Sequence, residues 1–334
     1  MLKSYQARLP IPTTWVLIGS IVALVALFSV PFYLHSEYSI RIAILVCLLG
    51  SASVGWNLLG GFANQISLGH ITFFGIGMYT VAIFQTSLHL SPWLAIPVAI
   101  VLSLFVACLI GWPSFQLSGH YFALATLALL PVSELVASGW ESLTGGSRGI
   151  SVPILPSGFA TLQFDSPVPF FYVSAVLLVI VLAVARMVQF STLGMRLAAI
   201  RGNPQAATLA GVNQFRSKMI SLLISAAIVT VAGALYGAFL QYVDPRTAFA
   251  WDTTINLVLF AIVGGLEFWW GPFLGALILI PINEYASLQL SGNFAALGQL
   301  AYGVILLLLI NFKPRGIGGL LNTIVRRMSE ASKK

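Results

Sequence analysis

The stretch from Gly60 to Thr80, GGFANQISLGHITFFGIGMYT, places polar side chains and repeated glycines inside a very apolar chain. Glycine lets a backbone bend or be approached closely, and it disfavours helix formation. Inside a membrane, irregular backbone persists only where protein buries it or water reaches it. Two interpretations follow. The stretch is a broken helix beside a transport pathway, or it is a site of close helix packing with polar side chains bonded across helices. On residue type alone, close packing is the commoner use.

The composition of the chain indicates a membrane protein. Of its 334 residues, 58% are hydrophobic and only 7% are charged, whereas soluble domains carry about 25% charged residues. Long apolar runs recur along the chain, which favours helices over the alternating pattern of a β-barrel. We therefore predict an all-α integral membrane protein, a polytopic helical bundle of about eight to ten transmembrane segments with about 20 residues per crossing.

Lysine and arginine gather at the two ends of the chain and in one loop. Because loops on the cytoplasmic side carry an excess of these residues, the pattern places both termini and this loop in the cytoplasm, and the net charge of +7 needs no nucleic-acid partner. The predicted organisation is a cytoplasmic tail (1–13), a transmembrane permease domain (14–312) and a second cytoplasmic tail (313–334). Within the domain we expect an extracytoplasmic loop at 139–169 and a cytoplasmic coupling loop at 189–218.

A second glycine-rich stretch echoes the first. Gly60-Gly61 opens the first stretch, and Gly264-Gly265 opens the second, GGLEFWWGPFLGA. Interrupted segments at corresponding places in two halves suggest an inverted repeat around a central pathway. Chance is the alternative in a chain with 30 glycines.

Several stretches together resemble the branched-chain amino acid ABC transporter permease family, and the larger of its two permease types. They follow the family's order and span roughly Gly55 to Leu321. The resembling stretches are GGFANQISLGHITFFGIGMYT, GHYFALATLALLPVSELV, WESLTGGSRGI, STLGMRLAAIRGNPQAATLAGVNQFRSK, ISAAIVTVAGALYG, GGLEFWWGPFLGALILI and YGVILLLLINFKPRGIGGLL.

The resemblance implies a set of partners. Such permeases lie in the bacterial inner (plasma) membrane among its lipids and pair with a second permease, two cytoplasmic ATPase subunits and an extracytoplasmic substrate-binding protein. This chain has no G-x-x-x-x-G-K-[ST] phosphate loop, so ATP hydrolysis must come from a partner. We expect no enzymatic activity, no cofactor and no metal site in the chain itself, and no nucleic-acid partner.

The coupling loop contains the signals of a short helix. Pro204 suits a first helical turn, Asn203 suits the N-cap and Gly211 suits the stop, so we predict a helix from Pro204 to about Ala210. The resemblance implies that this helix docks on the ATPase; a loop helix resting on the membrane surface is the alternative. The coupling residues expected are Arg201, Asn203, Ala206, Ala207 and Gly211.

This loop also departs from the family. Members usually place acidic residues roughly where Gly202, Pro204 and Thr208 stand, yet the sequence has no Asp or Glu between Arg186 and Asp244. The departure puts individual docking contacts in doubt and suggests a specialised ATPase partner.

Polar residues in the resembling stretches supply the remaining candidates. For the substrate pathway they are Gln65, Ser67, His70, Tyr121 and Thr126, and for the binding-protein contact Trp140, Thr144, Gly145 and Gly146. Structural hydrogen bonding is the alternative for the first group, and a plain solvated loop is the alternative for the second. The family usually has glycine where Asn64 and Glu267 occur, so these two residues distinguish this chain.

The function expected is therefore that of a permease subunit of an ATP-binding cassette importer for branched-chain (aliphatic) amino acids. Related systems carry urea, short amides or aromatic acids, and these substrates remain alternatives. An ion-coupled secondary transporter or channel is an alternative of another class, with Glu284 and Asn256 as candidate ion ligands. A structural subunit without a pathway is the third.

Overall fold

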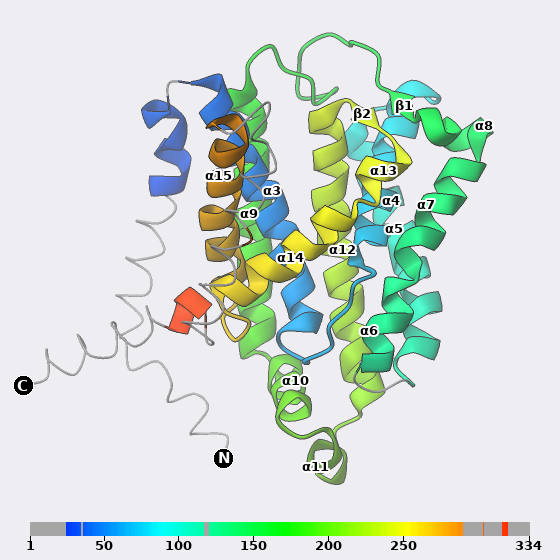
Figure 1. Ribbon diagram of the computed structural model, residues 1–334, viewed down its shortest axis with the longest axis vertical. Helices are drawn as coiled ribbons and strands as arrows, with labels where there is room; N and C mark the ends of the chain where they lie inside the picture. Colours follow the sequence, from blue (N-terminus) through cyan, green and yellow to red (C-terminus); the bar gives the residue numbers. More distant parts are fainter. Residues whose placement is uncertain (1–24, 35, 117–119, 290–302, 304–315, 320–334) are drawn as a thin grey trace, which may run out of the picture.

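The computed structural model of the chain describes residues 25–34, 36–116, 120–289, 303 and 316–319 (Figure 1). Helices make up most of this part, which confirms the predicted all-α class. The longer helices are α3 (Glu37–Gly60), α4 (His70–Thr86), α5 (Pro92–Ser114), α6 (His120–Leu127), α7 (Leu129–Gly139), α9 (Pro167–Phe190), α10 (Thr192–Gly202), α12 (Gln214–Leu240), α14 (Trp251–Gly264) and α15 (Gly271–Gln289). The tail 1–13, most of the tail 313–334 and the end of the predicted permease domain lie outside the described residues.

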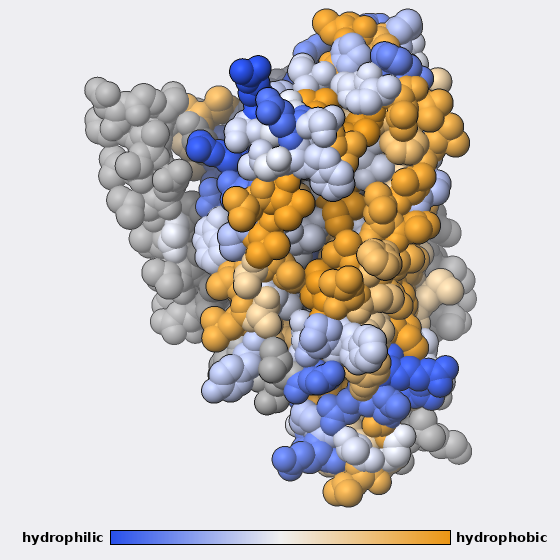
Figure 2. All heavy atoms as spheres, turned by 90° about the vertical axis from the view of Figure 1, so that its right-hand side faces the viewer, coloured by the Kyte–Doolittle hydropathy of each residue, from blue (hydrophilic) through white to orange (hydrophobic). Residues whose placement is uncertain are grey.

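Six helical segments in the described part of the chain are long and apolar enough to cross a membrane. They contain α3, α5, α6 with α7, α9, α12 and α14. Helix α4, with 17 residues, is shorter, and α15 contains Pro281. The other predicted crossings fall on α4, α15 and residues outside the described ones. Figure 2 shows an apolar band on the surface between two more hydrophilic ends, as a membrane-embedded bundle requires.

Helices α4 and α12 are packed together through small residues. A Cβ added to Gly77 would overlap the carbonyl oxygen of Thr230, and one added to Gly233 would overlap that of Phe74. Gly237, one turn beyond Gly233, also faces the backbone of α4, because an added Cβ would lie 2.9 Å from Met78 Cα. Glycines four residues apart let two helices approach to backbone contact. The second half of the first glycine-rich stretch, which forms α4, is therefore a site of close helix packing, as one of the two interpretations predicted.

Helix α3 is the interior element of the bundle. It packs against α9, α12, α14 and α15. Of its most apolar 18 residues, 83% are buried within this one chain, against 28% for α5. Two serines on α12 bond to its backbone. Ser221 donates to the Leu58 carbonyl oxygen and Ser225 to that of Gly55, both at 2.7 Å.

The short helices and strands lie at the two ends of the bundle (Figure 1). At one end lie α10 and the small helix α11 (Pro204–Leu209); we call this the basic end because it carries Arg196, Arg201 and Arg216. At the opposite end lie α8 (Glu141–Thr144), η1 (Gly146–Arg148), α13 (Pro245–Ala248) and an antiparallel pair of strands, β1 (Ile150–Ser151) and β2 (Tyr242–Val243). The sequence did not predict the strands, because two residues are too few to show alternation.

Helices make up much of the predicted coupling loop. Helix α12 begins at Gln214, inside the predicted loop 189–218. The remaining loop also contains helix α10, Thr192–Gly202, which the sequence did not predict. Ser191 joins α10 to α9: its hydroxyl donates to the Val188 carbonyl oxygen and accepts from the Gly194 N–H.

Both glycine-rich stretches interrupt helices. Residues 61–69 separate α3 from α4, and residues 265–270 separate α14 from α15. Both breaks lie at the basic end, and each follows a helix that runs toward that end (Figure 1). An inverted repeat requires opposite orientations, so this pair of breaks gives no support to the predicted inverted repeat.

Candidate functional site

The first break, residues 61–69, is bonded inside the protein. Trp56 Nε1 donates to the Ser67 carbonyl oxygen at 2.6 Å, and the Leu68 N–H donates to Thr126 Oγ1 at 3.1 Å. Because unpaired backbone groups are costly in an apolar medium, these side chains stabilise the irregular course of the chain. The break brings Ser67 and Thr126, two predicted pathway residues, close together.

Ser67 and Thr126 also line one small cavity. It lies between the first break, the start of α4 and the neighbouring ends of α5, α6 and α12, and its space of about 10 Å³ has room for about one water molecule. In this conformation the cavity therefore excludes an amino acid. The other residues that line it are Gly69, Phe73, Ile110, Gly111, Ser114, Phe122, Leu129 and Leu222.

His70 is held in a chain of hydrogen bonds. It is 1% exposed, and its Nε2 lies 2.8 Å from Ser225 Oγ. The single hydroxyl hydrogen of Ser225 is donated to the Gly55 carbonyl oxygen, so His70 Nε2 must carry the hydrogen of the second bond. Nδ1 is then an acceptor, and it has no partner among the described residues. The bonds join α4, α12 and α3, which favours the structural alternative for His70; its pathway role stays a prediction.

The two other pathway candidates lie apart from this cavity. Gln65 is half-buried in the first break, where its N–H donates to the Leu59 carbonyl oxygen at 3.3 Å. Tyr121 is 70% exposed on α6. Tyr121 therefore belongs to the outer surface of this chain, where lipid or another subunit can meet it.

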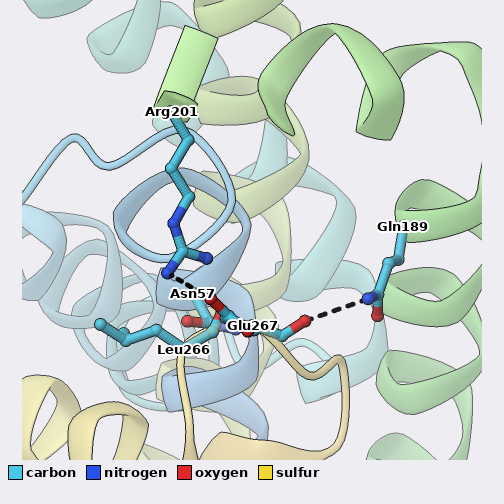
Figure 3. Close-up of polar contacts among 5 residues, drawn as sticks. All are labelled: Asn57, Gln189, Arg201, Leu266 and Glu267. Carbon is cyan, nitrogen blue, oxygen red and sulfur yellow. Dashed lines mark hydrogen bonds and ion pairs between the residues drawn. The ribbon is translucent and has the colours of Figure 1, made fainter. Parts of the chain in front are cut away.

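The second break, residues 265–270, is held by two amide side chains (Figure 3). Gln189, in the last turn of α9, donates from Nε2 to the Glu267 carbonyl oxygen and accepts at Oε1 from the Trp269 N–H, both at 3.0 Å. Asn57, in the last turn of α3, donates to the Leu266 carbonyl oxygen at 3.3 Å. The end of α3 therefore contacts the second break directly, and the two breaks share a boundary.

Glycines allow this crowded arrangement. A Cβ on Gly61 would overlap Asn57 Oδ1 and lie 2.6 Å from the Leu266 carbonyl oxygen. Gly265 has φ +116°, a conformation that favours glycine. Segment 316–319 packs on the same turn, because a Cβ on Gly316 would lie 2.7 Å from the Gly265 backbone. The second break is thus a junction of α3, α9 and segment 316–319.

One ion pair links this junction to the coupling loop. Arg201 Nη2, in the last turn of α10, lies 3.3 Å from Glu267 Oε1, and no other ion pair occurs among the described residues (Figure 3). The two side chains are 31% and 59% exposed. Such a solvent-accessible pair contributes about 0–1 kcal/mol to stability. We call it the Arg201–Glu267 clasp.

The short helix predicted in the coupling loop is confirmed. Helix α11 spans Pro204–Leu209, one residue less than expected, and Asn203 Oδ1 caps it by accepting from the Ala206 N–H at 3.0 Å. Gly211 follows with φ +81°, the left-handed conformation of a helix stop.

The side chains of this helix divide into two groups. Ala206 is exposed, whereas Ala207 is 4% exposed and packs inward. Leu209 is 91% exposed at the tip of the basic end. The surface that a partner could touch therefore includes Ala206 and Leu209 but not Ala207.

At the opposite end, three of the four predicted binding-protein contacts build a turn. Thr144 is buried, and its Oγ1 contacts the carbonyl oxygens of Ala137 and Trp140. Gly145 and Gly146 have φ +73° and +59°. Trp140, in contrast, is 54% exposed and is the one large apolar side chain of the four that is free to meet a partner.

Glu284, the ion-ligand candidate of the secondary-transporter alternative, has a hydrogen-bond partner. Its Oε2 accepts from the Tyr38 hydroxyl at 3.3 Å. Within the described residues, no three His, Cys, Asp or Glu side chains come together as a metal site. The Glu284 side chain therefore takes part in a hydrogen bond that joins α3 to α15.

Sequence reasoning missed two residues that organise the site, Asn57 and Gln189. Each is a single amide in the last turn of a long apolar helix. The available signal was the position of each amide: Asn57 stands just before a glycine pair, and Gln189 stands just before the coupling loop. The unusual Glu267 was noticed, but its partner Arg201 lies 66 residues away in sequence.

Comparisons with known proteins agree with this architecture. The family described as "Branched-chain amino acid transport system / permease component" matches residues 38–310. The high-affinity branched-chain amino acid transport system permease protein LivM of Escherichia coli is 26% identical over 319 residues, covering 89% of this chain and 74% of the relative. The LivH permease protein of the same organism is 24% identical over 283 residues (80% and 90%).

A probable LivM permease protein of Methanocaldococcus jannaschii is 23% identical over 291 residues, covering 80% of this chain and 83% of the relative. No solved structure gave a significant match. Because the family match covers most of the sequence and the helical architecture agrees with it, the chain belongs to the permease-component family of branched-chain amino acid transport systems.

Proposed function

We propose that this chain is the membrane-spanning permease subunit of an ATP-driven importer for branched-chain, aliphatic amino acids in the bacterial inner membrane. The family match over residues 38–310 is the observation that carries the proposal. The similarity to both LivM and LivH proteins supports pairing with a second, related permease. Two ATPase subunits and a substrate-binding protein complete the proposed complex.

The charge distribution supports one orientation. The basic end carries Arg196, Arg201 and Arg216, so it faces the cytoplasm under the positive-inside rule. The end with α8 and the strand pair then faces outward. Both chain termini lie on the cytoplasmic side in this proposal.

Helix α11 is the proposed ATPase docking element. It lies at the tip of the basic end, and exposed Leu209 and Ala206 give it an apolar, small-residue surface suited to a groove. Arg201, Asn203 and Gly211 position this surface through the clasp, the cap and the helix stop. Ala207 acts from the inside, as packing.

On the outer side we propose contact with the binding protein through Trp140, with Thr144, Gly145 and Gly146 shaping the turn beside it. The pathway candidates Ser67 and Thr126 lie beside the closed cavity, so the pathway widens only when neighbouring helices move. Gln65, His70 and Tyr121 complete the proposed set, with His70 contributing through helix packing.

Two solvent-exposed side chains give a matched test. Leu209 is 91% exposed on α11 at the basic end, and Ile154 is 95% exposed in the segment that follows β1 at the opposite end. The chain is produced with the products of its neighbouring genes, and partners that copurify are identified. Leu209→Asp should remove the ATPase, while Ile154→Asp should retain it. An ATPase that is absent from the unaltered preparation, or is lost equally from both variants, contradicts the proposal.

Substrate identity is tested with the intact complex in proteoliposomes. Leucine, isoleucine and valine with the binding protein should stimulate ATP hydrolysis and be imported. Stimulation by urea, short amides or aromatic acids alone would replace the proposed substrate. Uptake driven by an ion gradient without ATP would favour the secondary-transporter alternative.

A further inference from the structure

The Arg201–Glu267 clasp is a direct side-chain contact between the coupling loop and the second break. Ser191 ends α9 and is the N-cap of α10, and the far end of α10 carries Arg201 two residues before Asn203, the N-cap of α11. A force on α11 therefore acts at the end of α10 that is distant from Ser191. The side chain of Arg201 meets Glu267 at this distant end (Figure 3).

Glu267 belongs to a turn that reaches the interior of the bundle. Its neighbour Leu266 accepts a hydrogen bond from Asn57 of α3, and the first break begins four residues after Asn57, at Gly61. Residues 265–270 also connect α14 to α15. A displacement of Glu267 is thus passed to the ends of α3, α14 and α15.

The contacts of this turn differ in strength. Gln189 forms two hydrogen bonds at 3.0 Å to the backbone of the turn. Arg201, in contrast, contacts only the exposed Glu267 carboxylate, at 3.3 Å. An exposed ion pair is weak and forms and breaks readily. The turn therefore stays folded on α9 when the clasp opens, and the clasp is the contact that can change during a cycle.

From these contacts we infer that the Arg201–Glu267 clasp couples movement of the docking element α10–α11 to the helix breaks that control the pathway. Arg201 and Glu267 are positioning residues, since neither needs to touch the substrate. The inference rests on the proposed function, because it assigns a role within an ATP-driven cycle. The inference goes beyond the proposed function by naming the side chains through which the ATPase acts on the permease.

The test is a double-mutant cycle on the full complex in proteoliposomes. Arg201→Gln, Glu267→Gln and the double variant are compared for ATP hydrolysis and amino acid import under the same conditions. Each single variant should lower the amount imported per ATP hydrolysed by about three- to five-fold, which is the most that a contact as weak as an exposed ion pair can supply. The double variant should fall by the same factor, because both changes remove one shared contact.

Arg196→Gln is the matched control, because it removes the same charge from an exposed position on the same helix. It should leave the import-to-hydrolysis ratio within about two-fold, below the range of typical coupling effects. Arg201→Lys, which keeps the charge, should restore part of the ratio.

Three outcomes overturn the inference: an unchanged ratio in the single variants, a double variant that falls by the product of the single effects, or loss of the ATPase from the Arg201→Gln complex. Loss of the ATPase would make Arg201 a docking contact instead. ATP-driven import by the unaltered complex is measured first. Its absence contradicts the proposed function and is thereby distinguished from a failure of the clasp.

Discussion

Both helix breaks begin within a pair of glycines, Gly60-Gly61 and Gly264-Gly265, but they are stabilised in different ways. Residues 61–69 are held by two neutral hydrogen bonds, one donated by Trp56 and one accepted by Thr126. Residues 265–270 are held by an amide clamp and by the one ion pair found in the described part of the chain. The first break is anchored inside the bundle, and the second exposes a charged contact to solvent. Glycine content therefore identifies where a helix stops, while the surrounding side chains decide whether the break is fixed or can respond to a partner.

The largest effect is expected at the boundary that the two breaks share. Gly61→Ala places a methyl group against Asn57 and 2.6 Å from the Leu266 carbonyl oxygen, so the two breaks must separate. Overpacking of this kind costs about 3 kcal/mol. Thermal unfolding in detergent should shift down by several degrees. Gly139→Ala, where an added Cβ meets nothing within 4 Å, is the control; equal stability of the two variants would show that the breaks do not depend on each other.

A smaller effect is expected from His70, at the junction of the first break and α4. His70→Ala removes the bond to Ser225 and leaves a cavity, with an expected loss of about 2 kcal/mol in stability. His70→Gln can keep an N–H donor near the position of Nε2 and should recover part of this loss. If both variants were as stable as the unaltered protein but transported poorly, His70 would belong to the pathway and not to the packing.

The smallest effect on stability is expected at the second break. Glu267→Gln removes the charge of a side chain that is 59% exposed and should change the free energy of unfolding by no more than about 0.5 kcal/mol. Thermal unfolding of the purified subunit is the measurement. A drop comparable to that of His70→Ala would mean that the second break is as rigidly anchored as the first, and the contrast between them would disappear.

Local signals in the sequence were sufficient for much of the fold. Asn203, Pro204 and Gly211 define the ends of α11 through chemistry that acts within one helical turn, and the structure reproduces the cap and the stop. Glycine pairs likewise marked both helix ends, at Gly60 and Gly264. Such features depend on neighbours in sequence, so they can be read without knowing how the helices pack.

The parts that escaped prediction depend on contacts between distant segments. Gln189 shows no pattern with Glu267 in the sequence, yet its side chain fixes the second break. His70 resembled a pathway residue by type, and only its bond to Ser225 on α12 reveals a packing role. Residue type suggests what a polar group can do, whereas its partners, set by tertiary packing, determine what it does.

The interior position of α3 has a consequence for biosynthesis. Ser53 and Asn57 of α3 bond to the carbonyl oxygens of Leu257 and Leu266, which lie 204 and 209 residues later in the chain. At translation rates of about 5–20 residues per second, these partners emerge roughly 10–40 s after α3 has been made. Helix α3, the most buried of the six candidate spans in the described residues, is thus made well before the later segments that enclose it. Ser53 and Asn57 therefore reach their final partners only after residues 257–266 have been synthesised, so α3 takes up its interior position late in the assembly of the bundle.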